Sequence, residues 1–144
     1  MFLGEYEHTI DDKNRLTLPA KFRERLADGV VLTQGFEGRC LYAFSRSDWH
    51  TVIEQRVGSL DLLSTEGRSM RRFFFAGASE AELDKQGRIL VPATLAERVT
   101  LGHDVVVAGV YDHLEIWDRA AWRDQLKQVE GSAEHVAERL ANRA

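Results

Sequence analysis

The chain has 144 residues, 44% of them hydrophobic, which is enough for a packed core in one compact domain or two very small ones. Its formal net charge of −4 and its pI of about 5.7 exclude a general nucleic-acid coat protein, which would be basic, but permit a local basic patch. The single cysteine, Cys40, excludes an intrachain disulfide and predicts a reducing compartment. The first residues resemble neither a signal peptide nor a membrane span, so we expect a soluble, cytoplasmic protein with no membrane partner.

The first half of the chain predicts a strand, a polar turn, a short strand, a helix, two strands and an amphipathic helix. These elements cover residues 6–10, 11–14, 15–18, 19–26, 30–34, 40–44 and 48–57. Asn14 ends the turn and is one of the few residue types that tolerate a positive φ. Pro19 has the fixed φ that suits the first turn of a helix. Apolar residues spaced by three and four mark the last helix.

A spacer over about residues 58–74 follows, and Ser64 is placed to cap a helix within it. The second half then predicts the same order of elements as the first, and they cover residues 78–83, 84–87, 88–91, 92–99, 104–108 and 113–117. Trp122, Leu126 and Val129 predict a closing amphipathic helix. The tail from residue 131 is charged and rich in alanine, and we expect it to be helical or loose.

The two halves are copies of one module, related without a gap by an offset of 73 residues. Identical residue pairs at this offset include Phe2/Phe75, Gly4/Gly77, Asp11/Asp84, Arg15/Arg88, Pro19/Pro92, Arg25/Arg98, Leu41/Leu114 and Trp49/Trp122. Chance similarity would need gaps over such a span, so the sequence indicates an internal duplication. Because a module of about 60 residues is marginal alone, the copies are expected to pack on each other or on other chains.

The motif Asp-x-x-x-Arg occurs once in each copy, at the polar turn and the strand that follows it. The aspartates, Asp11 and Asp84, are expected to satisfy turn amides, and Gly87 to supply the left-handed turn residue. The arginines open a strand directly after a turn tip, where a guanidinium can point outward and reach phosphates or guanine edges. The candidate DNA-binding residues are Lys13, Asn14, Arg15, Arg23, Lys85, Gln86 and Arg88. A purely structural Asp–Arg pair is the alternative for each arginine.

Local charge favours the first turn over the second as a DNA contact. Residues 11–25 carry five cationic side chains against three carboxylates, whereas the matching segment of the second copy carries three against two. Arg68, Arg71 and Arg72 form another basic group in the spacer, which a solvated helix face explains more simply. Five scattered histidines, with no HExxH or CxxC spacing, no G-x-S-x-G elbow and no glycine-rich phosphate loop, predict no enzyme, no metal site and no cofactor.

The segments 1–6, 11–23 and 114–117 resemble the MraZ family, and the likeness covers nearly the whole chain. The resemblance implies an α+β fold of two tandem AbrB-like, swapped-hairpin β half-barrels with short helices, packed as a pseudo-dimer within one chain. The implied division is an AbrB-like domain 1, a helix and spacer, an AbrB-like domain 2 and a C-terminal helix or tail, over residues 5–49, 50–75, 76–122 and 123–144.

The same resemblance implies a bacterial transcriptional regulator of the division and cell-wall gene cluster, associated with the nucleoid. Such proteins assemble as rings and bind repeated short boxes upstream of their own operon. The family's arginines fall on Arg15 and Arg88 and its aspartates on Asp11 and Asp84; its usual glycine before the arginine is Asn14 in the first copy, which also tolerates the left-handed conformation.

Two classes of function therefore remain open. The first is a sequence-specific regulator whose partners are double-stranded DNA and further copies of the chain in a homo-oligomeric ring, with no small-molecule substrate. The second is an oligomeric interaction or scaffold module without specific DNA binding. A gel shift with the upstream DNA separates the two.

Overall fold

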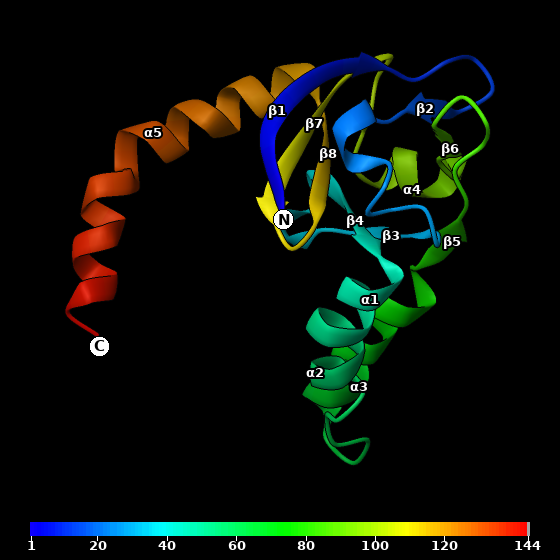
Figure 1. Ribbon diagram of the computed structural model, residues 1–144. Coiled ribbons are helices and arrows are strands. Elements are labelled where there is room, and N and C mark those ends of the chain that lie inside the picture. The colour runs from blue at the N-terminus through cyan, green and yellow to red at the C-terminus, as the bar shows by residue number, and fades with distance from the viewer. Residues whose placement is uncertain (144) are drawn as a thin grey trace.

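The body of the protein is an antiparallel β structure in which strands from both halves of the chain pair with one another (Figure 1). The computed structural model describes residues 1–143. Six strands form one sheet in the order β1-β7-β8-β4-β3-β5, and a separate two-stranded ribbon pairs β2 with β6. The strands are β1 (Phe2–Thr9), β2 (Arg15–Thr17), β3 (Val30–Gln34), β4 (Cys40–Ser45), β5 (Ser79–Ala81), β6 (Arg88–Leu90), β7 (Asp104–Tyr111) and β8 (Leu114–Asp118).

An internal two-fold relation organises the pairing between the two halves. In the ribbon, Arg15 lies opposite Leu90 and Thr17 lies opposite Arg88, and the offset of 73 residues converts one pair into the other. Strands β4 and β8 obey the same relation. The copies thus pair as two subunits of a dimer would, and the predicted α+β fold with a pseudo-dimer inside one chain is confirmed.

The main hydrophobic core lies between the six-stranded sheet and the ribbon. Side chains alternate along each strand, so one face of the ribbon points inward and the other faces solvent. The fully buried members of this core include Phe2, Leu16, Leu18, Leu32, Leu41, Ile89, Val105, Val107, Leu114 and Ile116. Because each such side chain contributes about 1.5–3 kcal/mol when it is buried, this core is the main stabilising element of the body.

A helical hairpin projects from the body between β4 and β5 (Figure 1). Its outgoing arm consists of α1 (Arg46–Asp48), the π-helical η3 (Trp49–Glu54) and α2 (Gln55–Val57), and its return arm of α3 (Thr65–Arg71) and the π-helical η4 (Arg72–Ala76). The predicted cap is confirmed, because the Oγ of Ser64 accepts a hydrogen bond of 2.9 Å from the Gly67 amide. A second apolar cluster holds the arms to the sheet and includes Val31, Phe44, Trp49, Ile53, Val57 and Phe74.

The helix predicted after Pro19 is wrong in length. It is a single 3₁₀ turn, η1 (Ala20–Phe22), followed by further turns, whereas the second copy forms the α-helix α4 (Ala93–Arg98). The amide of Phe22 donates to the carbonyl of Pro19 at 3.0 Å. A hydrogen bond to the residue three positions earlier is typical of 3₁₀ turns, which often serve as short connectors. Another 3₁₀ turn, η2 (Phe36–Gly38), joins β3 to β4.

The strand predicted over residues 78–83 is also shorter than expected, because only the three residues of β5 pair. The offset equates Phe2, a strand residue of the core, with Phe75, which lies in the return arm of the hairpin. The Phe75 ring packs against Trp49 with 6.1 Å between ring centroids. Packing against the hairpin therefore overrides the repeat at this point, as tertiary contacts often override local preference.

The C-terminal segment forms one continuous helix, α5 (Arg119–Ala141), so the closing amphipathic helix is confirmed and the tail takes the helical one of its two expected forms. Its first turns contact β7 and β8, and the rest of it extends away from the body (Figure 1). Residues 130–143 are all exposed. Within the described residues 1–143, no helix combines the length and the apolar character needed to cross a membrane.

Candidate nucleic-acid interface

The first polar turn is held by one carboxylate. Oδ1 of Asp11 accepts hydrogen bonds from the amides of Lys13 at 3.0 Å and Arg15 at 2.8 Å. Its Oδ2 accepts from Nε of Arg15 at 2.8 Å. The backbone closes the turn between the Asn14 amide and the Asp11 carbonyl at 3.0 Å, with Asn14 at a φ of 60°. The predicted left-handed Asn14 is confirmed.

The second turn repeats this geometry bond for bond. Oδ1 of Asp84 accepts from the amides of Gln86 and Arg88 at 2.9 Å each, and Oδ2 accepts from Nε of Arg88 at 2.7 Å. Gly87 occupies the left-handed position with a φ of 75°. Each aspartate therefore binds the turn amides, as the sequence predicted. Its bond to Nε also fixes the direction in which the arginine side chain points.

Cross-strand pairing places both arginines on the same face of the ribbon. Leu16 and Ile89 face each other on the buried side, with exposed fractions of 0% and 1%. The residues that flank them, Arg15 and Thr17 on β2 and Arg88 on β6, therefore share the opposite, outer face. Leu90 also lies there and is 58% exposed. The sequence placed each arginine after its own turn but did not indicate that the two meet on one surface.

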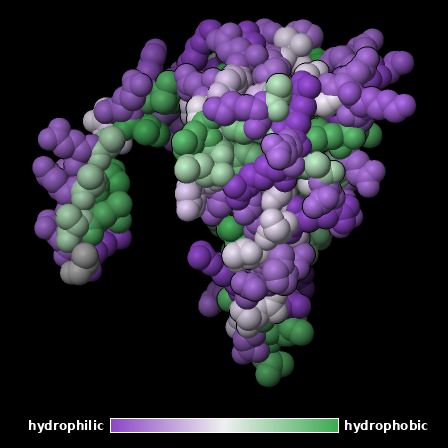
Figure 2. Space-filling model, in the orientation of Figure 1, coloured by the Kyte–Doolittle hydropathy of each residue, from purple (hydrophilic) through white to green (hydrophobic). Residues whose placement is uncertain are grey.

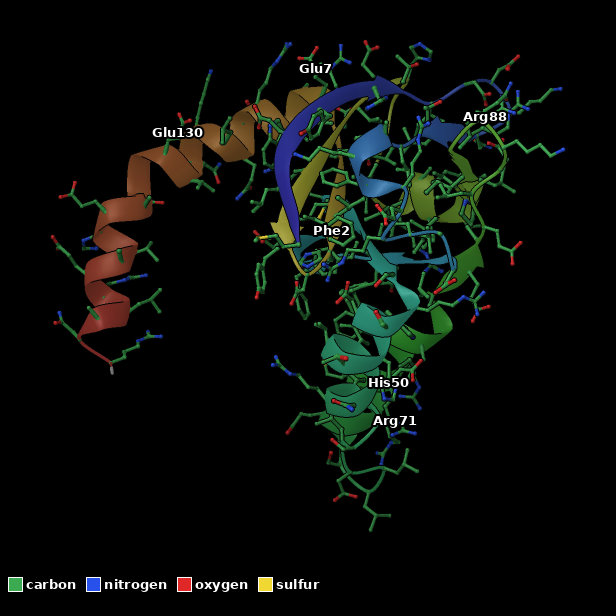
Figure 3. All side chains as sticks on the ribbon, in the orientation of Figure 1. Phe2, Glu7, His50, Arg71, Arg88 and Glu130 are labelled. Carbon is green, nitrogen blue, oxygen red and sulfur yellow. The ribbon has the colours of Figure 1, made fainter. Side chains whose placement is uncertain are left out.

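The turn tips carry the remaining candidate residues. Lys13, Lys85 and Gln86 are exposed, and Asn14 is partly buried. Figure 3 shows Arg88 at the outer edge of the body, beside the loops that carry the two turns. The outer face of the ribbon and the two tips together form the candidate interface, called here the ribbon face.

Arg23, another predicted DNA contact, is engaged inside the protein. Its Nε and Nη2 donate to the carbonyl of Leu18 at 3.1 and 3.0 Å. The guanidinium also lies against Gly87, where an added Cβ would collide with its Nε and Cζ atoms. Arg23 of the first copy therefore braces the turn of the second copy. A contact between Arg23 and DNA stays a prediction.

The residue that matches Arg23 cannot brace the first turn. The offset of 73 places Ala96 where Arg23 stands in the other copy, and alanine is too short to reach the turn. Beside Asn14 there is instead an open hollow of about 560 Å³, which Asp12, Ala96 and His103 help to line. This difference between the two turns could have been found by comparing the sequences of the two copies, because arginine and alanine stand at matching positions.

The braced turn gives a testable difference between the two copies. Replacing Gly87 with alanine forces a Cβ into the left-handed region and against Arg23, so we expect a loss of about 1–2 kcal/mol in the free energy of unfolding. Asn14→Gly is the matched control at the same turn position, and its effect should stay within about 1 kcal/mol. Thermal and urea denaturation measure both. An unchanged melting temperature for Gly87→Ala would contradict this reading of the turn.

The charge state of the turns is set by their own hydrogen bonds. The amide of Arg15 holds the pKa of Asp11 below its ordinary value, and the amide of Arg88 does the same for the pKa of Asp84. A lowered carboxylate pKa contributes stability above the ordinary value of 3.8, and this is lost only as the pH falls below it. Both turns therefore keep their ionised aspartates throughout the neutral range.

Other chemically capable groups are engaged elsewhere. Burial raises the pKa of the Cys40 thiol, which disfavours the reactive thiolate. Arg68 and Arg71 of the hairpin donate to the carbonyls of Leu62 and Gly58, each at 2.8 Å. Among residues 1–143, no group of three or more potential metal ligands comes together.

The fold and the ribbon face define a class: a fused pseudo-dimer of β half-barrels that displays two arginine-bearing turns on one surface. The family model "MraZ protein, putative antitoxin-like" matches the chain twice, over residues 1–71 and 74–144, which agrees with the internal duplication. The chain belongs to the MraZ family.

Curated relatives extend the likeness over nearly the full length. A protein of Roseiflexus castenholzii, named Transcriptional regulator MraZ, is 48% identical over 141 residues, which cover 98% of this chain and 97% of the relative. Relatives of the same name from Desulfitobacterium hafniense (strain Y51) and Moorella thermoacetica are 46% and 44% identical over 142 residues, covering 99% of this chain and 98% of each relative.

Proposed function

We propose that the protein is a transcription regulator, and not an enzyme, that binds double-stranded DNA through the ribbon face. The observation that carries the proposal is the display of Arg15 and Arg88 in identical geometry on one surface. Each aspartate engages the Nε of its arginine, and the Nη groups have no hydrogen-bond partner among residues 1–143. A guanidinium fixed in this way can give both Nη donors to a phosphate or to the edge of a guanine.

The exposed tips complete the proposed contact. Lys13 and Lys85 are placed to reach phosphates on either side of the two arginines, and Gln86 has an amide of the kind that reads adenine. The printed name of the relatives supports a part in transcription. We extend the proposal to repeated boxes upstream of the protein's own operon in the division and cell-wall cluster, and to a cytoplasmic, nucleoid-associated location.

Oligomer formation belongs to the same proposal. One ribbon face offers few cations in a chain of net charge −4, so a single copy would bind weakly. A homo-oligomeric ring would engage several boxes at once and raise the apparent affinity by about 10² or more. The division into units at 5–49, 50–75, 76–122 and 123–144 also stays a proposal, since strands of the two copies share one sheet.

The salt dependence of binding tests the proposal. If the assembly contacts roughly six phosphates, log K should fall with log salt at a slope near −5. Fluorescence anisotropy with a labelled upstream fragment measures this slope, and a scrambled fragment of equal length is the control. We expect tight binding to the repeated boxes, weaker binding to a single box, and weaker binding again to the scrambled fragment. Affinity that does not change with salt, or full affinity for one box, would contradict the proposal.

An oligomeric scaffold without specific DNA binding is the second candidate. The observation in its favour is the exposed apolar side of α5, which suits contact with protein. A scaffold would form oligomers but bind the upstream and scrambled fragments equally weakly, so the same anisotropy experiment separates the two candidates.

A further inference from the structure

Helix α5 carries an unbroken apolar stripe along one side. Its members recur at alternating spacings of four and three residues, which is the 3.5-residue period of helices that pack lengthwise on a partner. The stripe consists of Trp122, Leu126, Val129, Ala133, Val136 and Leu140. Figure 2 shows hydrophobic residues gathered along the extended part of the helix, on the side that faces the space beside the body.

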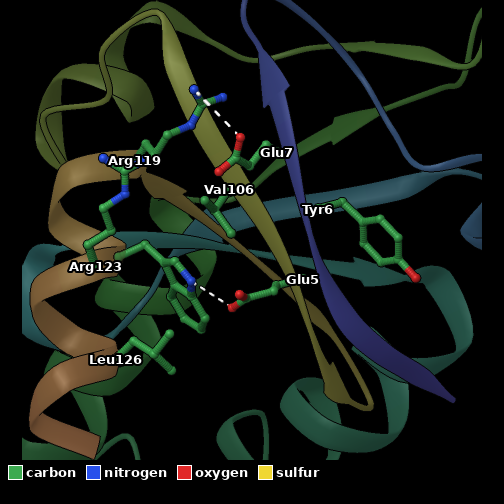
Figure 4. Close-up of a pocket in the computed structure, with 8 residues that line it drawn as sticks. Glu5, Tyr6, Glu7, Val106, Arg119, Arg123 and Leu126 are labelled. Atoms are coloured by element: carbon green, nitrogen blue, oxygen red, sulfur yellow. Dashed lines mark hydrogen bonds and ion pairs between the residues drawn. The ribbon is translucent and has the colours of Figure 1, made fainter.

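Only the first part of this stripe is used within the chain. The Trp122 ring packs on Trp117 with 5.7 Å between centroids, and its Nε1 donates to Oε2 of Glu5 at 2.8 Å. Arg119 lies 3.9 Å from a carboxylate oxygen of Glu7, and Leu126 lines the same seam between α5 and β1 (Figure 4). These contacts fix the direction in which α5 leaves the body.

The outer part of the stripe is uncovered. Val129, Val136 and Leu140 are exposed by 48%, 37% and 59%. The stability of helices in proteins comes mainly from burying an apolar face against a partner. The outer part of α5, called the arm, therefore has an exposed apolar side that is suited to packing on another protein surface.

The same chain carries an apolar groove beside its helical hairpin. It lies along the helical hairpin, has a volume of about 460 Å³, and is lined mainly by apolar and aromatic side chains, among them Phe36, Tyr42, Val52, Leu60 and Met70. The outgoing arm of the hairpin lines the groove from Val52 to Val57, and the outer part of α5, residues 129–141, is about 20 Å long. Phe36 and Leu60 are exposed by 49% and 38%.

Charges at the two surfaces are compatible. Glu130 stands beside the stripe at the start of the extended part of α5, and Arg56 stands at the rim of the groove, where it is exposed and has no acidic partner within the described chain. Asp112 also lines the groove, but it is paired with His113 at 2.7 Å.

We propose that the outer part of α5 docks into the hairpin groove of a second copy of this chain. The helix extends away from its own hairpin, so it cannot fill its own groove without giving up the seam that orients it (Figure 1). Each chain then has one arm and one groove, which is a heterologous contact that repeats from copy to copy and closes into a ring where the rotation allows. This inference supplies the contact that the proposed assembly needs. The docking is tested by the mass of the oligomer in the absence of DNA. A failure of the docking is therefore distinguishable from a failure of DNA binding.

Two variants and their mixture test the docking. Val136→Glu with Leu140→Glu disables the arm, and Leu60→Glu disables the groove; all three positions are exposed, so both variants should keep the melting temperature of the folded body. The control is His135→Glu, on the polar side of α5. Light scattering should give an oligomer for the unaltered chain and the control, and 16.4 kDa for each variant alone.

A mixture of the two variants gives the most specific test of the docking. A chain with an intact groove and a chain with an intact arm can form one contact and no more, so the mixture should give a species of twice the monomer mass. A monomeric unaltered chain, or an oligomer that survives the arm variant, would overturn the proposal. If the groove variant still forms an oligomer and the arm variant does not, the docking proposal is wrong and two α5 helices pair with each other instead.

Discussion

Replacing Arg15 with alanine should sharply weaken DNA binding while leaving the fold in place. The side chain is partly exposed, and its pair with Asp11 is a surface ion pair worth about 0–1 kcal/mol, so the melting temperature should barely change. A lost contact to a base or phosphate costs about 1–3 kcal/mol at each site, and an assembly repeats that loss in every copy. Arg88→Ala should act in the same direction but less strongly, because Arg15 stands in the more basic copy, beside Lys13.

Anisotropy with the upstream boxes, thermal denaturation and light scattering measure binding, stability and assembly for each variant. Arg25→Ala is the matched control, since Arg25 pairs with Asp48 of the hairpin at 2.9 Å and lies outside the ribbon face. It should bind DNA normally. If Arg15→Ala binds normally but melts early, the arginine is structural and the ribbon face is not the DNA contact.

Leu16→Ala should cause the largest loss of stability on the ribbon. Leu16 is completely buried between the two copies, and truncation of a buried leucine costs about 2–5 kcal/mol because the cavity does not fully collapse. The matched control lies on the same ribbon with the opposite orientation: Leu90 is 58% exposed, so Leu90→Ala should change the free energy of unfolding by no more than about 0.5 kcal/mol.

Urea denaturation of the two leucine variants measures the difference directly. The contrast tests the inside–outside assignment on which the placement of both arginines depends, because a slip of one residue in the β2–β6 register would exchange the two faces. Equal losses for Leu16→Ala and Leu90→Ala would refute that register.

The parts of the site that could be predicted are those that depend on neighbours in the sequence. Each aspartate reaches amides two and four residues ahead, and Asn14 and Gly87 are among the few residue types suited to a positive φ, so the turns follow from their local sequence. The offset of 73 predicted that two marginal modules of equal pattern pack on each other or on other chains, and the family resemblance implied the pseudo-dimer.

What could not be predicted depends on contacts between distant segments. Nothing near Arg15 in the sequence says that β2 pairs with β6, although this pairing brings Arg88 onto the same face. Arg23 was predicted to face DNA because it is a cation in a basic run, yet its reach across the copy boundary to Gly87 depends on the closed fold. Phe75 departs from the repeat for the same reason, since the hairpin gives it an aromatic partner in Trp49.

The brace that Arg23 gives to only one of the two turns has a consequence for the shape of a DNA site. A protein formed from two identical subunits presents two identical reading elements and favours a palindrome, because operator symmetry mirrors protein symmetry. Fusion of the halves into one chain lifts that constraint, because Arg23 packs against the second turn whereas Ala96 leaves an open hollow beside the first. If the ribbon face binds DNA as proposed, its site is therefore free to have a direction along the duplex.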